Sequence, residues 1–152
     1  MAEGLMSEFL SVVAMYDPFD GAGTTVVSDA WDMQKHRQVM AIIATGTIQA
    51  AGTLDARFEE SATSNGTFTT LNGKAMTQFT TADAAKQVIM NLSSKELAAT
   101  TITGARWARL HITAAAATVA FAAVVLGHRH RFHVPFTTVA YGDLASVDEI
   151  VV

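Results

Sequence analysis

The segment from Thr53 to Glu59 alternates with a period of two, and this alternation constrains the fold more than any other feature of the sequence. Apolar Leu54, Ala56 and Phe58 alternate with charged residues. Successive side chains of a β-strand point to opposite faces, so we expect a strand with one buried and one solvated face. Such half-buried strands are typical of antiparallel sheets that cover a core on one side.

Short β-rich runs separated by turn signals surround this strand, at the close spacing expected of an all-β sandwich or barrel. The other runs predicted as strands are Thr24–Val27, His36–Thr47, Met76–Phe79, Lys86–Leu92, Ala105–Ile112 and Thr113–Leu126. Asn65-Gly66 and Asn72-Gly73 are turn signals, because both residue types tolerate positive φ. Four consecutive alanines in the last run also favour helix, but their β-branched neighbours favour a strand buried on both faces.

The start of the chain fits two interpretations. Met6–Val13 would place apolar side chains on one helical stripe, whereas Ser11–Tyr16 suits a strand equally well. The turn residues of Asp17–Gly23 end either element. We therefore predict an N-terminal arm over residues 1–23 and one antiparallel β-sandwich, jelly-roll-like, over residues 24–152.

Length and composition favour a single domain with little charge. The chain has 152 residues, of which 50% are hydrophobic and 16% charged, against about 25% charged in an average soluble domain. Part of the surface is then apolar, which is usual for a protein that buries surface against copies of itself or a partner. The alternative is a single domain that stays monomeric and whose surface binds no partner.

Charge, cysteine content and hydropathy exclude several classes of protein. The net charge is -4 and the basic residues are mostly scattered, which disfavours binding to nucleic acid. The chain has no cysteine, so disulfides, thiol catalysis and cysteine-ligated metals are excluded. The apolar stretch Ile112–Gly127 is shorter than the roughly 20 residues that span a bilayer, so we expect no membrane partner. Glu3 and Glu8 stand where a signal peptide needs basic residues, so we expect no export signal.

One cluster has the residue types of a metal site. His128 and His130 share one face of an extended strand, where two imidazoles can ligate a metal. Cupins combine such a pair with a carboxylate shortly afterwards, but Val134–Thr138 holds no glutamate. We therefore predict no metal site and no cofactor, and keep a cupin-like metal-binding enzyme as the alternative.

No residue is predicted to be catalytic, because the nucleophile elbow, the phosphate-binding loop and the zinc-protease motif are all absent. We expect His36 and His111 to be structural, and Trp31 and Trp107 to pack in the core rather than anchor an interface. The carboxylates expected on a solvated face are Asp29, Asp32, Asp55, Glu59 and Glu60. The expected activity is binding, not catalysis.

The pattern from about residue 24 to 152 resembles the head decoration, or cement, proteins encoded beside the major capsid gene of tailed bacteriophages. The segments that carry the resemblance are Trp31–Met33 before the strand His36–Thr47, Gly73–Met76, Ser93–Leu97, Arg106–Leu110 and Asp143–Val151. Residues 1–23 have no counterpart in it.

The resemblance implies a jelly-roll-like sandwich that binds the major capsid protein and its own copies, as a trimer. Such a protein is made in the host cytoplasm, lies on the outer surface of the virion and bridges neighbouring capsid subunits. The weakly acidic charge suits that outer position, away from DNA. A tail or head–tail connector protein, which would form rings, is a second structural alternative.

Overall fold

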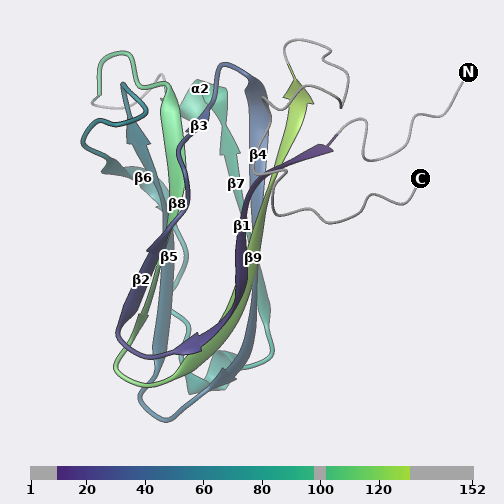
Figure 1. The fold of residues 1–152 in the computed structure, drawn as a ribbon, viewed down its shortest axis with the longest axis vertical. Coiled ribbons are helices and arrows are strands. Elements are labelled where there is room, and N and C mark those ends of the chain that lie inside the picture. The colour runs from purple at the N-terminus through teal and green to yellow at the C-terminus, as the bar shows by residue number, and fades with distance from the viewer. Residues whose placement is uncertain (1–9, 98–101, 131–152) are drawn as a thin grey trace, which may run out of the picture.

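The computed structural model describes residues 10–97 and 102–130, which form two antiparallel sheets (Figure 1). Sheet A contains, in spatial order, β1 (Leu10–Gly21), β9 (Val119–His130), β4 (His36–Ile48) and β7 (Gln87–Ser93). Sheet B contains β2 (Thr24–Val27), β8 (Trp107–Ala115), β5 (Thr53–Ser61) and β6 (Thr69–Ala75), and the short β3 (Trp31–Asp32) pairs with β8. The helical segments are η1 (Thr81–Asp83) and α2 (Ser94–Leu97).

The strand order identifies the architecture. The chain passes repeatedly between the sheets, so that the order is 1-9-4-7 in sheet A and 2-8-5-6 in sheet B. Eight strands wound in this order form a jelly roll, which combines two Greek keys. The predicted all-β, jelly-roll-like sandwich is therefore confirmed.

The core lies between the sheets and follows the predicted alternation. Phe58 on β5 and Leu110 on β8 are fully buried, as are Ile43 on β4 and Val125 on β9. Trp31 packs edge-on against Phe58, with ring centroids 6.1 Å apart and an interplanar angle of 89°. The prediction that Trp31 belongs to the core is confirmed, since only 5% of its surface is exposed.

The N-terminal strand departs from the predicted division of the chain. Residues 10–21 form β1, which pairs with β9 from Leu10 opposite His128 to Gly21 opposite Val119. The sandwich therefore includes more than half of the segment predicted as an arm, while residues 1–9 lie outside the described part. The strand interpretation of Ser11–Tyr16 is correct because β9 offers a partner along its whole length.

Three local predictions need correction. Asn72-Gly73 is not a turn but lies within β6, where Gly73 has a φ of 72° beside a register shift in the ladder. Glycine accepts this conformation at a β-bulge. Met76–Phe79 is not a strand and meets β5 through an isolated bridge at Phe79 and a hydrogen bond from the Met76 amide to the Ala56 carbonyl at 2.9 Å. The run Thr113–Leu126 is broken at Ala116, whose φ of 65° turns the chain from β8 into β9.

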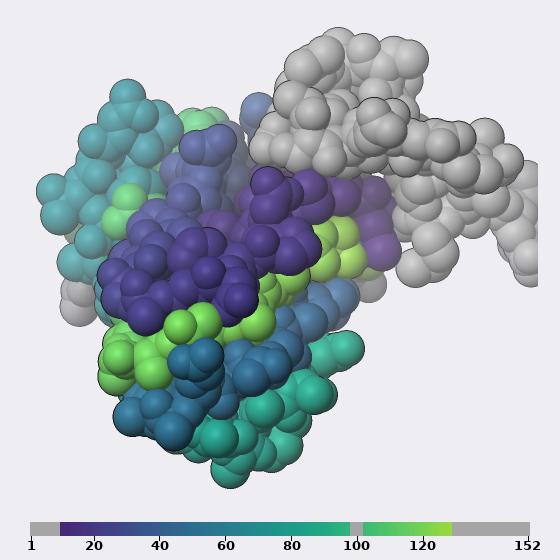
Figure 2. Space-filling view, turned by 60° about the horizontal axis from the view of Figure 1, so that its bottom comes forward, coloured from purple at the N-terminus to yellow at the C-terminus, as the bar shows by residue number. Residues whose placement is uncertain are grey.

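At the lower end of the sandwich, segments that are far apart in the sequence lie side by side (Figure 2). The Gln49 amide donates to the Thr118 carbonyl at 2.9 Å, and the Ala85 amide donates to the Gly46 carbonyl at 3.0 Å. Ala51, like Ala85 and Ala116, adopts a positive φ here. This backbone network fixes the ends of β4 and β9, the two central strands of sheet A.

Gly127 is the point of closest approach inside sheet A. A Cβ at this position would lie 2.5 Å from Nδ1 of His36 and 2.8 Å from Cγ2 of Val13. His36 is buried, which confirms its predicted structural role. We expect Gly127→Ala to lower the free energy of unfolding by about 1–3 kcal/mol through overpacking. Urea denaturation measures the loss, which His36→Ala should partly reverse in the double variant. An unchanged urea midpoint in Gly127→Ala would contradict this packing.

Tyr16 connects the two sheets. Its hydroxyl donates to the Leu110 carbonyl oxygen at 2.6 Å, and burial raises the pKa of Tyr16 to about 12. Above its ordinary pKa of 10.0, the unfolded chain loses this proton before the folded chain does. The stability contributed by neutral Tyr16 is therefore complete below pH 10 and declines as the pH rises toward 12.

Absorbance titration of the phenolate band tests this expectation. The sequence has two tyrosines, Tyr16 and Tyr141, so Tyr16→Phe leaves a single phenol for comparison. The wild type should show an ionisation near pH 12 that the variant lacks. The variant should also lose about 1 kcal/mol at neutral pH, the typical value of one hydrogen bond. Two ionisations near the ordinary value in the wild type would contradict the buried position of Tyr16.

Candidate interaction face

The outer face of sheet A carries an uninterrupted apolar row across all four strands. Met15 on β1 lies opposite Val124 on β9, which lies opposite Ile42 on β4, which lies opposite Ile89 on β7. Directly opposed residues of antiparallel strands bring their side chains together on the same face. We call this line of four side chains the middle row.

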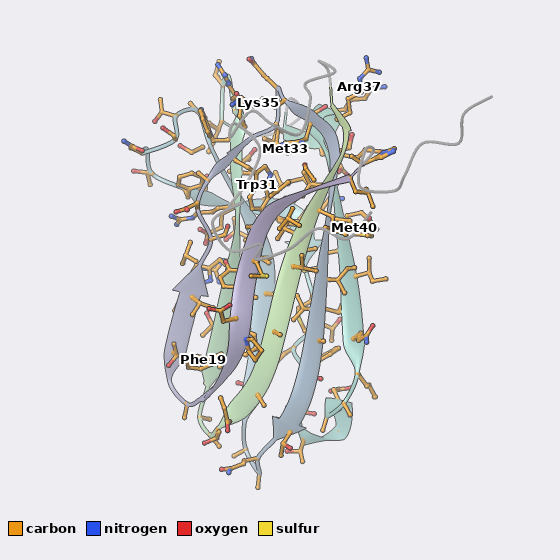
Figure 3. All side chains as sticks on the ribbon, turned by 45° about the vertical axis from the view of Figure 1, so that its right-hand side comes forward. Phe19, Trp31, Met33, Lys35, Arg37 and Met40 are labelled. Carbon is orange, nitrogen blue, oxygen red and sulfur yellow. The ribbon has the colours of Figure 1, made fainter. Side chains whose placement is uncertain are left out.

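Large side chains dominate the face above the middle row. The next row upward holds, from β1 to β7, Val12, Leu126, Met40 and Asn91. Figure 3 turns sheet A toward the viewer and labels Met40 on this face. The upper half of the face is therefore built from branched and long apolar side chains, with an amide only at the β7 edge.

On the two central strands small residues form the face below the middle row, while the exposed Gln87 lies opposite Ala44 at the β7 edge. On the central strands the next row downward holds Ala122 and Ala44. Farther down, Ala120 lies beside Gly46, where an added Cβ would come within 3.1 Å of the Ala120 Cβ. The outer face is thus stepped, with a raised upper half and a shallow lower half.

The apolar centre of this face is surrounded by polar groups. Ile89 is 57% exposed and Met15 38% exposed, and both are among the exposed large hydrophobic residues of the described chain. The outward positions from Met40 to Ala44 on β4 and from Ala120 to Leu126 on β9 include no charged residue. Asp17 and Asp20 are exposed on lower β1. An apolar centre with a polar rim is the usual anatomy of a protein–protein interface.

The outer face of sheet B, unlike that of sheet A, carries charged side chains that are joined by hydrogen bonds. The two carboxylate oxygens of Glu59 accept hydrogen bonds from Arg57 at 2.9 Å and from Arg109 at 2.8 Å. Arg57 also contacts His111 at 3.2 Å, and the Arg109 guanidinium lies 4.2 Å from the ring centroid of Phe68. Burial is the main cause that lowers the pKa of His111. In this compact network one carboxylate lies between two guanidinium groups, which leaves a net charge of +1, and the ion pairs stabilise the pairing of β5 with β8.

Several side chains predicted to be solvated are buried. Asp32, Glu59 and Glu60 expose only 3–4% of their surface. Asp32 forms an ion pair with Arg106. Burial opposes ionisation of Asp32, but hydrogen bonds from Arg106 and from a backbone amide hold its pKa below the usual value. The prediction of a solvated face is wrong for these three carboxylates, and for Asp32 and Glu59 arginine side chains take the place of water as hydrogen-bond partners.

Trp107 also differs from its prediction. It points away from the core on β8, with the Arg106 guanidinium 5.6 Å from its ring centroid, whereas Ala108 and Leu110 face inward. The predicted alternation of this strand is correct, but the core position expected for Trp107 is wrong. His111 shares the outer face with Trp107.

Of the two histidines considered as metal ligands, His128 lies away from the interior. His128 follows Leu126 and lies on the outer face of sheet A, whereas Gly127 between them faces inward. His130 ends β9, and its side chain lies outside the described residues. Within residues 10–97 and 102–130, no group of three or more metal-ligating side chains is close enough to hold a metal ion. No helix in this part of the chain is long and apolar enough to cross a membrane.

The sequence of β9 already contains a signal for the apolar face. The run Thr118–Leu126 has apolar residues at both inward and outward positions, which predicted a strand buried on both faces. Within one copy, the inner face of β9 is covered by sheet B, and its outer face belongs to the stepped surface. The continuous run therefore marks a strand that a second layer can cover.

Comparisons with known proteins identify a shared fold. No family model matches the chain, and no curated protein matches its sequence. A chain in the structure of infectious bursal disease virus, Gx strain, is similar over 84% of this chain and 32% of that chain, with 13% identity and a TM-score of 0.50. A chain in the structure of the Gt strain is similar over 77% of this chain and 31% of that chain, with 12% identity and a TM-score of 0.49. The protein spans about a third of the length of these viral chains.

Proposed function

We propose that this protein is a structural subunit of a virus particle, which acts by binding other protein subunits and not by catalysis. The observation that carries the proposal is the uncharged apolar face of sheet A, whose middle row crosses every strand of the sheet. A monomeric soluble protein rarely leaves such a contiguous apolar patch in water, unless the patch binds a partner.

The fold supports this proposal at the level of architecture. Jelly rolls with two four-stranded sheets are used by viral capsid domains, as well as by lectins and cupins. A chain in a virus structure has a similar fold at 13% identity. Because fold alone does not imply function, the proposal depends on the face and takes the fold as context.

More narrowly, we propose that the protein decorates and stabilises a bacteriophage capsid by bridging major capsid subunits. Its motifs resemble those of cement proteins, and its net charge of -4 suits a position away from nucleic acid. A cement protein stabilises a shell by adding buried surface across the joints between subunits. A specific interface of this kind buries about 1,200–2,000 Å² in total.

The position of His128 argues against the cupin-like alternative. His128 lies on the outer face of sheet A, between Leu10 and Gln38 of the neighbouring strands, and residues 10–97 and 102–130 hold no group of three or more metal-ligating side chains close enough for a metal ion. Elemental analysis of protein purified without a histidine tag tests this alternative directly. A stoichiometric metal would favour it over the structural function.

Mass spectrometry of purified virus particles from the host that produces this chain tests the proposed function. We expect the protein in the particle fraction, at a fixed ratio to the major capsid protein after density-gradient purification. A particle reconstruction then separates a cement protein on the shell from a connector protein in a ring at the tail vertex. Absence of the chain from purified particles would refute the structural function.

A further inference from the structure

We propose that two copies of this chain pack sheet A against sheet A, with the second copy inverted along the strand direction. The two-fold axis would lie across the strands at the middle row, so that the upper half of each face covers the lower half of the other. This inference deepens the proposed function by naming a second copy as one partner, and it rests on that function only for its biological setting.

The stepped shape of the face supports the inverted arrangement. Met40 and Leu126 stand one row above the axis, and Ala44 and Ala122 stand one row below it. Inversion places the large pair of one copy over the small pair of the other, whereas an upright copy would oppose large to large and small to small. Complementary packing of this kind is what the cores of protein interfaces require.

The charges at the two ends of the face support the same arrangement. Asp20 lies opposite Ala120, two rows below the middle row, and Asp17 is close to it on β1. Two rows above the middle row, His128 lies opposite Gln38, and the exposed Arg37 precedes Gln38 at this upper end of β4 (Figure 3). Inversion brings the acidic end of each copy to the basic end of the other, so opposite charges meet at both rims.

The size of the face fits a weak, reversible pair. Between Gln38 and Gly46 the strands advance about 27 Å, and four strands are about 19 Å wide, which gives roughly 500 Å² of flat face. Two copies would together bury roughly 1,000 Å² or somewhat more, which is near the lower limit of a specific interface. We therefore expect pairing that depends on protein concentration.

The edge of sheet A is less suited to pairing than its face. Beside β7, a groove of about 330 Å³ is lined by Gly73–Met76 and Val88–Asn91. Lys74 crosses this edge, donates a hydrogen bond to the Asn91 carbonyl at 2.9 Å and forms an ion pair with Glu96 at 2.7 Å. A lysine placed over a sheet edge discourages the addition of another strand.

Analytical ultracentrifugation of the full chain tests the pairing. The wild type should change from one copy to two as its concentration rises. Ile89→Lys puts a charge on the axis, and Ala122→Trp fills the shallow half; each should raise the dissociation constant at least about tenfold. The matched control is Val27→Lys, because Val27 is 40% exposed on β2, away from this face. It should leave the pairing unchanged.

Ile89 is 57% exposed, so its substitution leaves the core intact, and circular dichroism verifies the fold of each variant. A wild type that stays a single copy at every concentration would overturn the inference. A dimer or trimer that Ile89→Lys and Ala122→Trp leave unchanged would also overturn it. None of these results bears on whether the chain is present in virus particles, so the proposed function stands or fails separately.

Chemical cross-linking tests the inverted orientation. The chain has no cysteine, so Met40→Cys and Ala44→Cys each introduce a unique thiol. In the inverted pair, residue 40 of one copy faces residue 44 of the other, while two copies of residue 40 are offset by about 14 Å along the strands. A short bis-maleimide should therefore link the two variants when mixed, and link neither one efficiently alone. Efficient linking of Met40→Cys to itself would refute the inversion.

Discussion

Replacing Phe58 by alanine is expected to lower the free energy of unfolding by about 3–5 kcal/mol, the range for a fully buried aromatic side chain. Phe58 is 0% exposed at the centre of β5, and its ring meets the edge of Trp31 at a centroid distance of 6.1 Å. The space left behind is bordered by both sheets, whose backbones are fixed by their hydrogen-bonded ladders and so collapse little. Urea denaturation followed by tryptophan fluorescence measures the loss.

A second phenylalanine provides the matched control for this variant. Phe68 precedes β6 on the outer face of sheet B, where it covers the Arg109 guanidinium and is only partly buried. Phe68→Ala removes the same atoms but leaves no enclosed cavity, so its effect should be much smaller. Equal losses in the two variants would mean that Phe58 is not the centre of the core.

The strands of the sandwich were largely predictable because their alternation is local. In β5 and β8 each inward residue is separated from the next by one polar residue, and the buried positions Leu54, Phe58 and Leu110 follow that pattern. β1 was harder to predict. Its apolar spacing also fits a helix, and only pairing with β9, more than a hundred residues later, decides between the two.

The candidate face could not be read from the sequence for a related reason. β4 and β9 are apolar on both faces, and such a pattern does not distinguish a second layer of the same chain from a partner. The ion pairs of sheet B were also hidden. Glu59 and Arg109 are far apart in the sequence, and the register of β5 against β8 alone places them opposite each other.

The buried carboxylate of Glu59 should be the polar group whose loss destabilises the fold most. Its side chain is 6% exposed and binds two arginines whose side chains are 34% and 29% exposed. Hydrogen bonds between charged groups contribute about 1.5–3 kcal/mol each. Because water partly screens the arginines, we expect Glu59→Ala to lower the free energy of unfolding by about 2–4 kcal/mol in total.

Salt dependence distinguishes the loss of this charge from a general loss of packing. In Glu59→Ala, Arg57 and Arg109 remain on adjacent strands without the carboxylate between them. Their repulsion should weaken as added salt shortens the Debye length from about 10 Å at 0.1 M to about 3 Å at 1 M. Urea denaturation at both salt concentrations should therefore show partial recovery in Glu59→Ala, and none in Phe58→Ala. If salt leaves the deficit of Glu59→Ala unchanged, its cause is lost packing and not the two uncompensated guanidinium groups.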